Sequence, residues 1–431
     1  MPVDLQAFLA DDGRAVVRRG VNAYDRSTGA SRYDFVVSRT GNGEWLAPEQ
    51  FNEAVGGGRW YANPQGWVAA VAEVSGTNRK FKSARPMGPQ IGTALQAAPT
   101  YELPGISLNR SLSVIDAEGT QYIARVAPRT PLAGWQLTVA RFGTDGQADT
   151  PVVLRDEQGA ADTPYFSAST TDEMTMVWWG RFGASTSWPY EMQTADLSLT
   201  DRMAFGSQPV GAATNDCPVA PAVYKKGRVS LVLWGQKNAA ARCGLHVRVI
   251  DSRYGSTRLQ DAVLNPAGPD VRKAWASVGA GGELQVLWYQ HEEPRLWVSS
   301  ATLPAVKDQP WAWSAAQPLS VNGEPVSVDS PERGSLVPDM AVKEGSGGHL
   351  AVAYVRYATS ERAAIVYTPG RGWSPEKRIS VDAGHSGLSA DNLALSSSGT
   401  LLVTYPVLHF CANTRSNCEG NKHYLMAVVL D

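Results

Sequence analysis

The chain has 431 residues, enough to bury a large core and to form two or three ordinary domains unless repeated units pack on one another. Glycine (41), proline (27), tryptophan (14) and tyrosine (15) are abundant, a mixture typical of short strands joined by tight turns. The formal net charge is −2 and no long run of lysine or arginine occurs, so we expect no nucleic-acid partner. No apolar run approaches the roughly 18 residues of a membrane span, so we also expect no membrane insertion.

One short pattern, a tight turn closed by glycine between two apolar stretches, recurs along the chain. "PAVYKKGRVSLVLWG" (221–235) and "ALSSSGTLLVTYPV" (394–407) are two copies. The turns end at Gly13, Gly66, Gly119, Glu173 (in the glycine's place), Gly227, Gly282, Gly348 and Gly399. Successive spacings are 53, 53, 54, 54, 55, 66 and 51 residues. A period this steady indicates a repeat array or a propeller.

Each repeat reads as a unit of up to four strands. In the first unit we predict strands in "DLQAFLA" (4–10), "RAVVRRGV" (14–21), "RYDFVVSRT" (32–40) and "EWLAPEQF" (44–51). The second strand is almost continuously apolar, as a strand buried on both faces should be, and the later strands alternate. The fourth strand often opens with tryptophan. Helical periodicity of useful length is absent.

The last unit has a second strand at 400–407 and a third at 423–430, and no fourth strand is visible before Asp431. We expect this unit to be three-stranded or to be completed by a few residues preceding the first unit. Four-stranded antiparallel units bury both faces only against one another. We therefore predict an all-β fold, a single β-propeller domain spanning 1–431 with eight four-stranded blades. The alternative is a seven-bladed ring with an extra hairpin.

Two turns between third and fourth strands resemble the sialidase-type propeller repeat, Ser-x-Asp-x-Gly-x-Thr-Trp. They are "RTGNGEWLAPEQF" (39–51) and "YTPGRGWSPEKRIS" (367–380), with Trp45 and Trp373 as the closing tryptophans. Gly370 holds the glycine position, Asn42 stands there in the first unit, and both turns lack the Ser and Asp of the repeat. The resemblance implies a Trp-anchored outer strand. The three arginines, the Tyr/Glu pair and the Asp acid of a sialidase are not found by motif.

Four cysteines occur in loop-like contexts, which favours disulfides and an oxidising compartment. We predict the pairs Cys217–Cys243 and Cys411–Cys418; four unrelated thiols are the alternative. The start of the chain does not resemble a signal peptide, so a secreted or periplasmic location requires that a signal was removed. No cysteine or histidine spacing fits a metal site, and we expect neither metal nor cofactor.

In a propeller of this pattern, the loops between second and third strands share one face with the connections between units. Both predicted disulfides lie there. The other face consists of short turns that offer little to a ligand. Aromatic, basic and acidic groups of the loop face suit sugar or peptide recognition. The predicted ligand-binding residues of these loops are Arg181, Trp188, Tyr190, Arg295, Arg356, Tyr357 and His409.

First strands line the central channel, and charges gather at its mouth on the loop face. They are Asp4, Arg110, Lys273, Asp339 and Asp391. These groups could pair with one another, or they could bind a polar ligand, with Arg110 and Lys273 as ligand-binding residues. For any acid–base chemistry the candidate residues are His291, Glu292, Asp339 and Asp391. Glu292 could equally belong to a solvated turn.

Three functions remain open. The first is an extracytoplasmic propeller that recognises a glycan or a protein surface through its loop-rich, disulfide-pinned face. The second is a glycan-cleaving hydrolase or lyase with acidic residues at the channel mouth. The third is an assembly scaffold. No nucleophile elbow, zinc-protease motif, phosphate-binding loop or EF-hand loop is present to decide between them.

Overall fold

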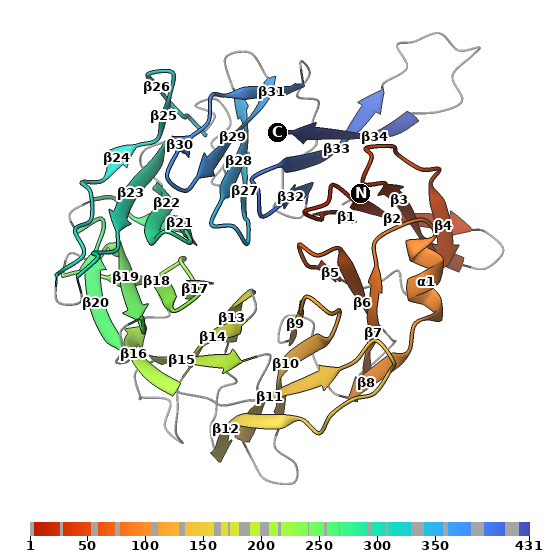
Figure 1. The fold of residues 1–431 in the computed structure, drawn as a ribbon, viewed down its shortest axis with the longest axis horizontal. Helices are drawn as coiled ribbons and strands as arrows, with labels where there is room; N and C mark the ends of the chain where they lie inside the picture. The colour runs from red at the N-terminus through yellow and green to blue at the C-terminus, as the bar shows by residue number, and fades with distance from the viewer. Residues whose placement is uncertain are drawn as a thin grey trace.

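The computed structural model describes residues 4–25, 29–52, 59–73, 78–104, 111–128, 134–158, 165–170, 173–180, 190–198, 207–213, 217–239, 241–253, 257–266, 268–290, 295–306, 309–328, 340–356, 361–380, 392–409 and 422–431. Antiparallel sheets stand side by side around a central axis (Figure 1). In each sheet the first strand lies innermost, and the later strands follow outward. This is a β-propeller.

Blades 1 to 4 are formed by strands between Asp4 and Ala213. Blade 1 has β1 (Asp4–Leu9), β2 (Ala15–Asp25), β3 (Gly29–Arg39) and β4 (Glu49–Asn52). Blade 2 has β5 (Trp60–Ala62), β6 (Trp67–Glu73), β7 (Asn78–Pro86) and β8 (Thr100–Pro104), with helix α1 (Ile91–Ala97) before β8. Blade 3 has β9 (Ser111–Ile115), β10 (Gln121–Pro128), β11 (Gly134–Phe142) and β12 (Val152–Gln158). Blade 4 has β13 (Tyr165–Thr170), β14 (Glu173–Gly180), β15 (Tyr190–Ser198) and β16 (Ser207–Ala213).

The remaining sheets complete the ring. Blade 5 has β17 (Ala222–Lys226), β18 (Val229–Lys237), β19 (Cys243–Asp251) and β20 (Arg258–Val263). Blade 6 has β21 (Val271–Val278), β22 (Glu283–Gln290), β23 (Leu296–Thr302) and β24 (Gln317–Pro318), followed by the small hairpin β25 (Ser320–Val321) and β26 (Glu324–Pro325). Blade 7 has β27 (Met340–Glu344), β28 (Leu350–Arg356), β29 (Glu361–Thr368), β30 (Gly372–Trp373) and β31 (Lys377–Ser380). The last sheet has β32 (Leu393–Leu395), β33 (Leu401–His409) and β34 (Lys422–Leu430).

The prediction of eight four-stranded blades is wrong. Among the described residues six sheets have four strands, the blade 7 sheet has five, and β32–β34 has three. The molecule is therefore an all-β seven-bladed propeller, with β32–β34 as a three-stranded sheet between blade 7 and blade 1, here called the closing sheet. This is nearer to the alternative of seven blades and an extra hairpin, although the extra element has three strands.

The five-stranded sheet of blade 7 has a local cause. In blade 7 the outer strand is split, because β30 and β31 both pair with β29 on either side of Pro375, which has no amide hydrogen to donate to the ladder. In the closing sheet β33 pairs with β32 on one side and with β34 on the other, with Leu430 opposite Leu401.

The recurring turn between first and second strands has one geometry in six sheets. Its first residue donates its N–H to the carbonyl four residues on, and the glycine donates back to that first residue. These six glycines have φ between 81° and 95°, a left-handed conformation that suits glycine. They are Gly13, Gly66, Gly119, Gly282, Gly348 and Gly399. The sequence period was therefore a period of hairpins.

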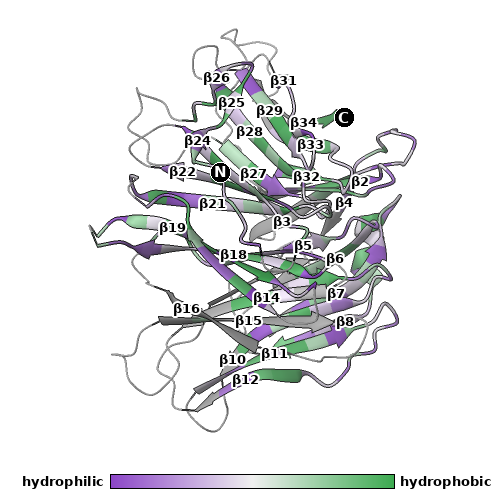
Figure 2. Ribbon diagram, turned by 60° about the vertical axis from the view of Figure 1, so that its left-hand side comes forward, coloured by the Kyte–Doolittle hydropathy of each residue, from purple (hydrophilic) through white to green (hydrophobic). Residues whose placement is uncertain are grey.

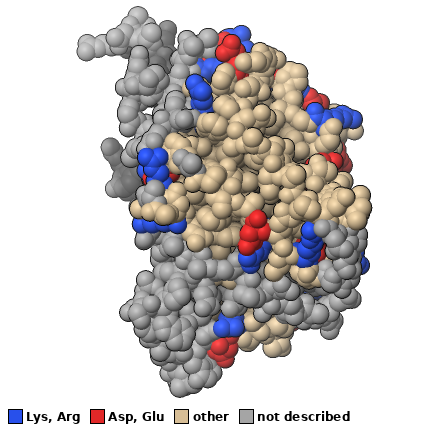
Figure 3. Space-filling model, turned by 90° about the vertical axis from the view of Figure 1, so that its left-hand side faces the viewer, with Lys and Arg blue, Asp and Glu red and all other residues tan. Residues whose placement is uncertain are grey.

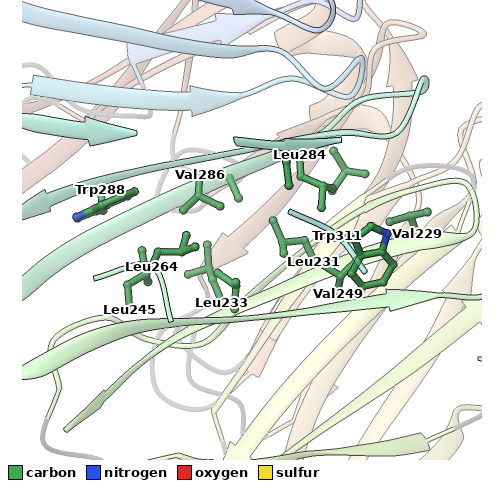
Figure 4. Close-up of a cluster of buried hydrophobic side chains, with 14 of the residues drawn as sticks. Val229, Leu231, Leu233, Leu245, Val249, Leu264, Leu284, Val286, Trp288 and Trp311 are labelled. Atoms are coloured by element: carbon green, nitrogen blue, oxygen red, sulfur yellow. The ribbon is translucent and has the colours of Figure 1, made fainter. Parts of the chain in front are cut away.

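Buried apolar side chains fill the spaces between neighbouring sheets. In one such cluster Leu231 and Leu245 of blade 5 face Leu284 and Trp288 of blade 6 (Figure 4). All of β22 except Glu283 is buried, as expected for a second strand. In Figure 2 the hydrophobic colour runs along the strands, and hydrophilic colour is frequent at the turns. Sheet-to-sheet packing thus holds each first strand at the axis.

Candidate functional site

A cavity of about 700 Å³ lies on the ring axis, at the end where the hairpins between first and second strands meet. It is enclosed by parts of blades 1, 2, 3, 5, 6 and 7 and of the closing sheet. Its lining includes residues 6–9, 11, 59–65, 113–117, 222–226, 276–278, 343–346, 348, 394, 395 and 397. The volume lies within the range of roughly 300–1,000 Å³ of small-ligand sites. We call this space the axial cavity.

A hydrogen bond joins two sides of the axial cavity past the inner strand of blade 6. The Tyr224 hydroxyl, on β17, donates to Glu344 Oε1, on β27, at 3.3 Å. Burial raises the pKa of the Glu344 carboxyl, while nearby Lys343 and the Tyr224 hydrogen bond act to lower it. Burial and the neighbouring carboxylate also raise the pKa of Tyr224 well above its usual range, so its hydroxyl stays protonated and donates.

Lys226 crosses from blade 5 to blade 7 in the same way. Its ammonium donates to the carbonyl oxygen of Ser346 at 3.0 Å, in the hairpin that follows Glu344. It also lies near the buried imidazole of His349, whose pKa is lowered first by burial and then by this lysine. The ammonium has three donors, and this carbonyl uses one of them. Blades 5 and 7 therefore bring two polar bridges to one side of the axial cavity.

The aspartates of the axial cavity serve the turns themselves. Asp11 accepts hydrogen bonds from the backbone N–H and the hydroxyl of Ser397, at 2.7 and 2.5 Å, and so ties blade 1 to the closing sheet. Asp116 accepts from the backbone N–H groups of Glu118 and Thr120 within its own hairpin. Their carboxylates are thus engaged in shaping the hairpins.

Gln6 is held in place on the blade 1 wall. Its Oε1 accepts from the buried guanidinium of Arg18 at 2.8 Å and from the backbone N–H of Trp60 at 3.2 Å. The Arg18 guanidinium also lies over the Trp60 ring, 5.7 Å from its centroid. These contacts fix one polar side chain at the blade 1–2 boundary of the axial cavity.

Most of the predicted site residues lie outside the described residues. This holds for all four candidate catalytic residues, His291, Glu292, Asp339 and Asp391, and for Arg110, Arg181, Trp188 and Tyr357. Tyr190 and His409 lie in β15 and β33, but their side chains are not described. Their roles stay predictions.

Three predicted ligand-binding residues are described. Arg356 is engaged by Glu376, which accepts from its guanidinium Nε at 2.9 Å and also accepts from the Tyr354 hydroxyl. Arg295 is exposed and forms an isolated backbone bridge with Ser327. Lys273 is exposed on β21, opposite Tyr289 in the register, and is not in the wall of the axial cavity. The structure does not bring these three side chains together at the axial cavity.

The predicted bridge between Cys217 and Cys243 is confirmed, with a Cα–Cα distance of 5.6 Å. It ties the segment before β17 to the start of β19. Cys411 and Cys418 lie outside the described residues, so their pairing stays a prediction. A disulfide is consistent with an oxidising compartment.

Sequence reasoning missed the axial cavity because it dismissed the short turns one by one. Each hairpin is small, but the inner ends of seven sheets together form the wall of the axial cavity. A signal was present in the pairs of charged residues that end two first strands, Lys225–Lys226 and Lys343–Glu344. Both pairs hold the same position at the end of the first strand, and aligning the repeats would have placed these charges together at this end of the axis.

The described residues hold no group of three or more His, Cys, Asp or Glu side chains that could bind a metal ion. Among these residues no helix has the length and apolar character that a membrane span requires. On the side of the molecule that is at the left in Figure 1, charges of both signs are scattered over a mostly uncharged surface (Figure 3).

No family model matches the chain, and no curated protein matches it. Solved propellers are similar to it at low identity. The apo form of prolyl oligopeptidase B from Galerina marginata has 11% identity and a TM-score of 0.47, covering 94% of this chain and 55% of that one. This chain therefore spans about half of the peptidase's length.

Two further propellers match over nearly their whole length. The β-propeller domain of the Trilobed protease from Pyrococcus furiosus has 9% identity and a TM-score of 0.46, covering 88% of this chain and 98% of that one. The Aleuria aurantia lectin, a fungal lectin with a six-bladed propeller and a fucose recognition mode, has 8% identity and a TM-score of 0.36, covering 89% and 99%. At these values neither match carries a function over to this chain.

Proposed function

We propose that this protein is a binding module that takes a polar ligand, a glycan in the first instance, into the axial cavity. The observation that carries the proposal is the cavity itself, about 700 Å³ on the ring axis with polar side chains from several sheets in its wall. Gln6, Ser113, Tyr224 and Ser277 all contribute to that wall. Amide, hydroxyl and phenol groups around one space suit a ligand with many hydroxyl groups.

The wall is also preorganised. Gln6 is fixed by two donors, and Tyr224 is fixed by its hydrogen bond to Glu344. Ser113 accepts a hydrogen bond from the Gln121 amide at 2.7 Å. Side chains that are already ordered lose little conformational entropy when a ligand binds. This arrangement favours recognition of one ligand shape over general adhesion.

A second candidate site is the loop face predicted from the sequence, with Trp188, Tyr190 and Tyr357 as its aromatic residues. The observation in its favour is the Cys217–Cys243 bridge, which ties the blade 4–5 connection to the loop before β19. A pinned loop face suits a glycan or a protein surface. In this reading the protein works outside the cytoplasm, secreted or periplasmic.

A glycan array followed by a panel of soluble polysaccharides tests the proposal. Binding without new reducing ends or unsaturated products supports a binding module. Turnover that Asp339→Asn abolishes would instead favour the glycan-cleaving alternative. Absence of glycan binding and of turnover would leave an assembly scaffold as the better account.

Two matched variants locate the site. Ala117 is exposed at a hairpin tip and lines the axial cavity, so Ala117→Trp should block entry. Ala315 is exposed in the outer part of blade 6, away from the axial cavity, so Ala315→Trp is the control. Loss of binding in Ala117→Trp alone supports the axial cavity. Loss in Trp188→Ala with Ala117→Trp unaffected would place the site on the loop face.

A further inference from the structure

The ionic groups of the axial cavity are unevenly distributed. Blade 5 contributes Lys225 and Lys226, and blade 7 contributes Lys343. Between them the lining residues of blade 6, 276–278, carry no charge. Blade 2 adds Arg59, which hydrogen-bonds Tyr61. The aspartates, Asp11 and Asp116, lie on blades 1 and 3. The blade 5–7 side of the axial cavity is therefore its cationic side.

The only carboxylate among the described lining residues of that side is Glu344. It is part-buried, and one of its oxygens accepts the Tyr224 hydrogen bond. Burial raises its pKa relative to that of an exposed glutamate. Three ammonium groups beside one part-buried carboxyl give this side a positive potential.

Lys226 and Lys343 keep donors for a ligand. Within the described part of the chain neither Lys226 nor Lys343 belongs to a salt bridge closer than 4 Å, although Lys343 is near enough to Glu344 to influence it. Lys226 spends one of three N–H donors on Ser346. The aspartates across the cavity, by contrast, already accept hydrogen bonds from Ser397, Glu118 and Thr120.

We propose that the axial cavity selects an acidic saccharide, one carrying a carboxylate or sulfate group, and that Lys226 and Lys343 bind that group. This inference rests on the proposed function and gives its ligand class. A free phosphate or sulfate ion would fill only a small part of about 700 Å³ and would leave Gln6, Ser113 and Ser277 without a role. The sugar hydroxyl groups would meet these polar side chains.

The test compares trigalacturonate with trigalactose, which differ by a carboxylate against a hydroxymethyl group on each ring, by calorimetric titration and on an array of matched acidic and neutral glycans. We expect acidic members to bind roughly tenfold more tightly, the effect of one charge-assisted hydrogen bond. The preference should shrink between about 20 mM and about 300 mM salt. Inorganic phosphate and sulfate are titrated separately.

Three variants assign the preference to residues. Lys343→Met should remove most of the preference for acidic over neutral glycans, and Lys343→Arg should keep it. Lys377→Met is the control, because Lys377 lies on the outer strand β31 of the same blade and the change in net charge is identical. Thermal melting checks that each variant folds. If Lys343→Met does not fold, Lys226→Met takes its place.

The outcomes separate the two proposals. Equal binding of acidic and neutral glycans, both blocked by Ala117→Trp, overturns the acidic preference and leaves the proposed function standing. An acidic preference that survives both Lys343→Met and Lys226→Met also overturns the inference. If phosphate or sulfate alone binds as tightly as the saccharide, the inference that the ligand is a saccharide is overturned. No glycan binding to the axial cavity overturns the proposed function itself.

Discussion

The Tyr224 hydroxyl donates a hydrogen bond to Glu344 Oε1 at 3.3 Å, and these residues are 120 positions apart in sequence. One belongs to blade 5 and the other to blade 7, so the contact passes the inner strand of blade 6. Most packing in a propeller is between neighbouring sheets. This pair couples sheets that are not neighbours, at the wall of the axial cavity.

Tyr224→Phe should destabilise the protein by about 1 kcal/mol, because the part-buried Glu344 carboxyl loses a hydrogen-bond donor. Urea unfolding at neutral pH measures the change. The matched experiment is the same substitution in a Glu344→Met background, which removes the acceptor and completes a double-mutant cycle. A coupling energy near zero would contradict an energetic role for this bond.

Glu344→Gln should flatten the pH dependence of stability. Burial raises the pKa of Glu344 above its ordinary 4.5, so between pH 4.5 and the folded-state pKa the folded protein binds more protons than the unfolded chain. The unfolding free energy therefore falls as pH rises through that window. Glutamine cannot ionise, and its Oε1 can still accept from Tyr224. Urea unfolding across about pH 4–8 measures both slopes, and identical slopes would refute the assignment.

Gly119→Ala and Gly227→Ala form a matched pair of turn substitutions. Both glycines have positive φ, 87° and 56°. A Cβ at Gly119 would come 2.6 Å from the Trp67 ring, whereas at Gly227 nothing lies within 4 Å. We expect Gly227→Ala to cost about 1 kcal/mol from backbone strain, and Gly119→Ala to cost about 2–4 kcal/mol. Thermal or urea unfolding compares the two variants. Equal losses of unfolding free energy would show that the Trp67 side chain moves aside at no cost.

Removing the Cys217–Cys243 bridge should lower stability without changing the fold. The bridge joins residues 26 apart, for which loop-closure entropy predicts about 3–4 kcal/mol. The double variant Cys217→Ser/Cys243→Ser should lower the unfolding temperature and keep the far-ultraviolet circular dichroism spectrum. The parent protein with and without reductant is the control. An unchanged unfolding temperature would mean that the bridge constrains nothing in the unfolded chain.

The propeller fold, but not its number of blades, was predictable because its signal is local and repeated. Gly13, Gly66 and Gly119 mark hairpins of one geometry, and each adopts the positive φ that the turn requires. The tryptophans predicted to open fourth strands pair with the third strand, Trp45 with Arg39 and Trp373 with Tyr367, although β4 itself begins only at Glu49. The strand count failed where one residue, Pro375, splits an outer strand, and in the closing sheet.

The axial cavity was not predictable in the same way. Tyr224 and Glu344 each look like ordinary residues at the end of a first strand, and only ring closure brings them within hydrogen-bond distance. Arg356 is a second example: it was predicted to bind a ligand, and its contact with Glu376 was not foreseen, while its ligand-binding role stays a prediction. A single sequence does not reveal which charges meet a partner from a distant unit.

The contacts between hairpin turns have a mechanical consequence. Ser397 holds Asp11, the Asp11 N–H donates to the Pro64 carbonyl at 2.8 Å, and the Asn63 amide donates to the Asp116 carbonyl. From the closing sheet through blades 1 and 2 to blade 3, each described hairpin turn is hydrogen-bonded to the next. The opening of the axial cavity at these turns is therefore rigid. Widening this opening would break several of these hydrogen bonds at once. A ligand must therefore fit the opening as it is, and its association rate should depend on its cross-section more than on any rearrangement of the protein.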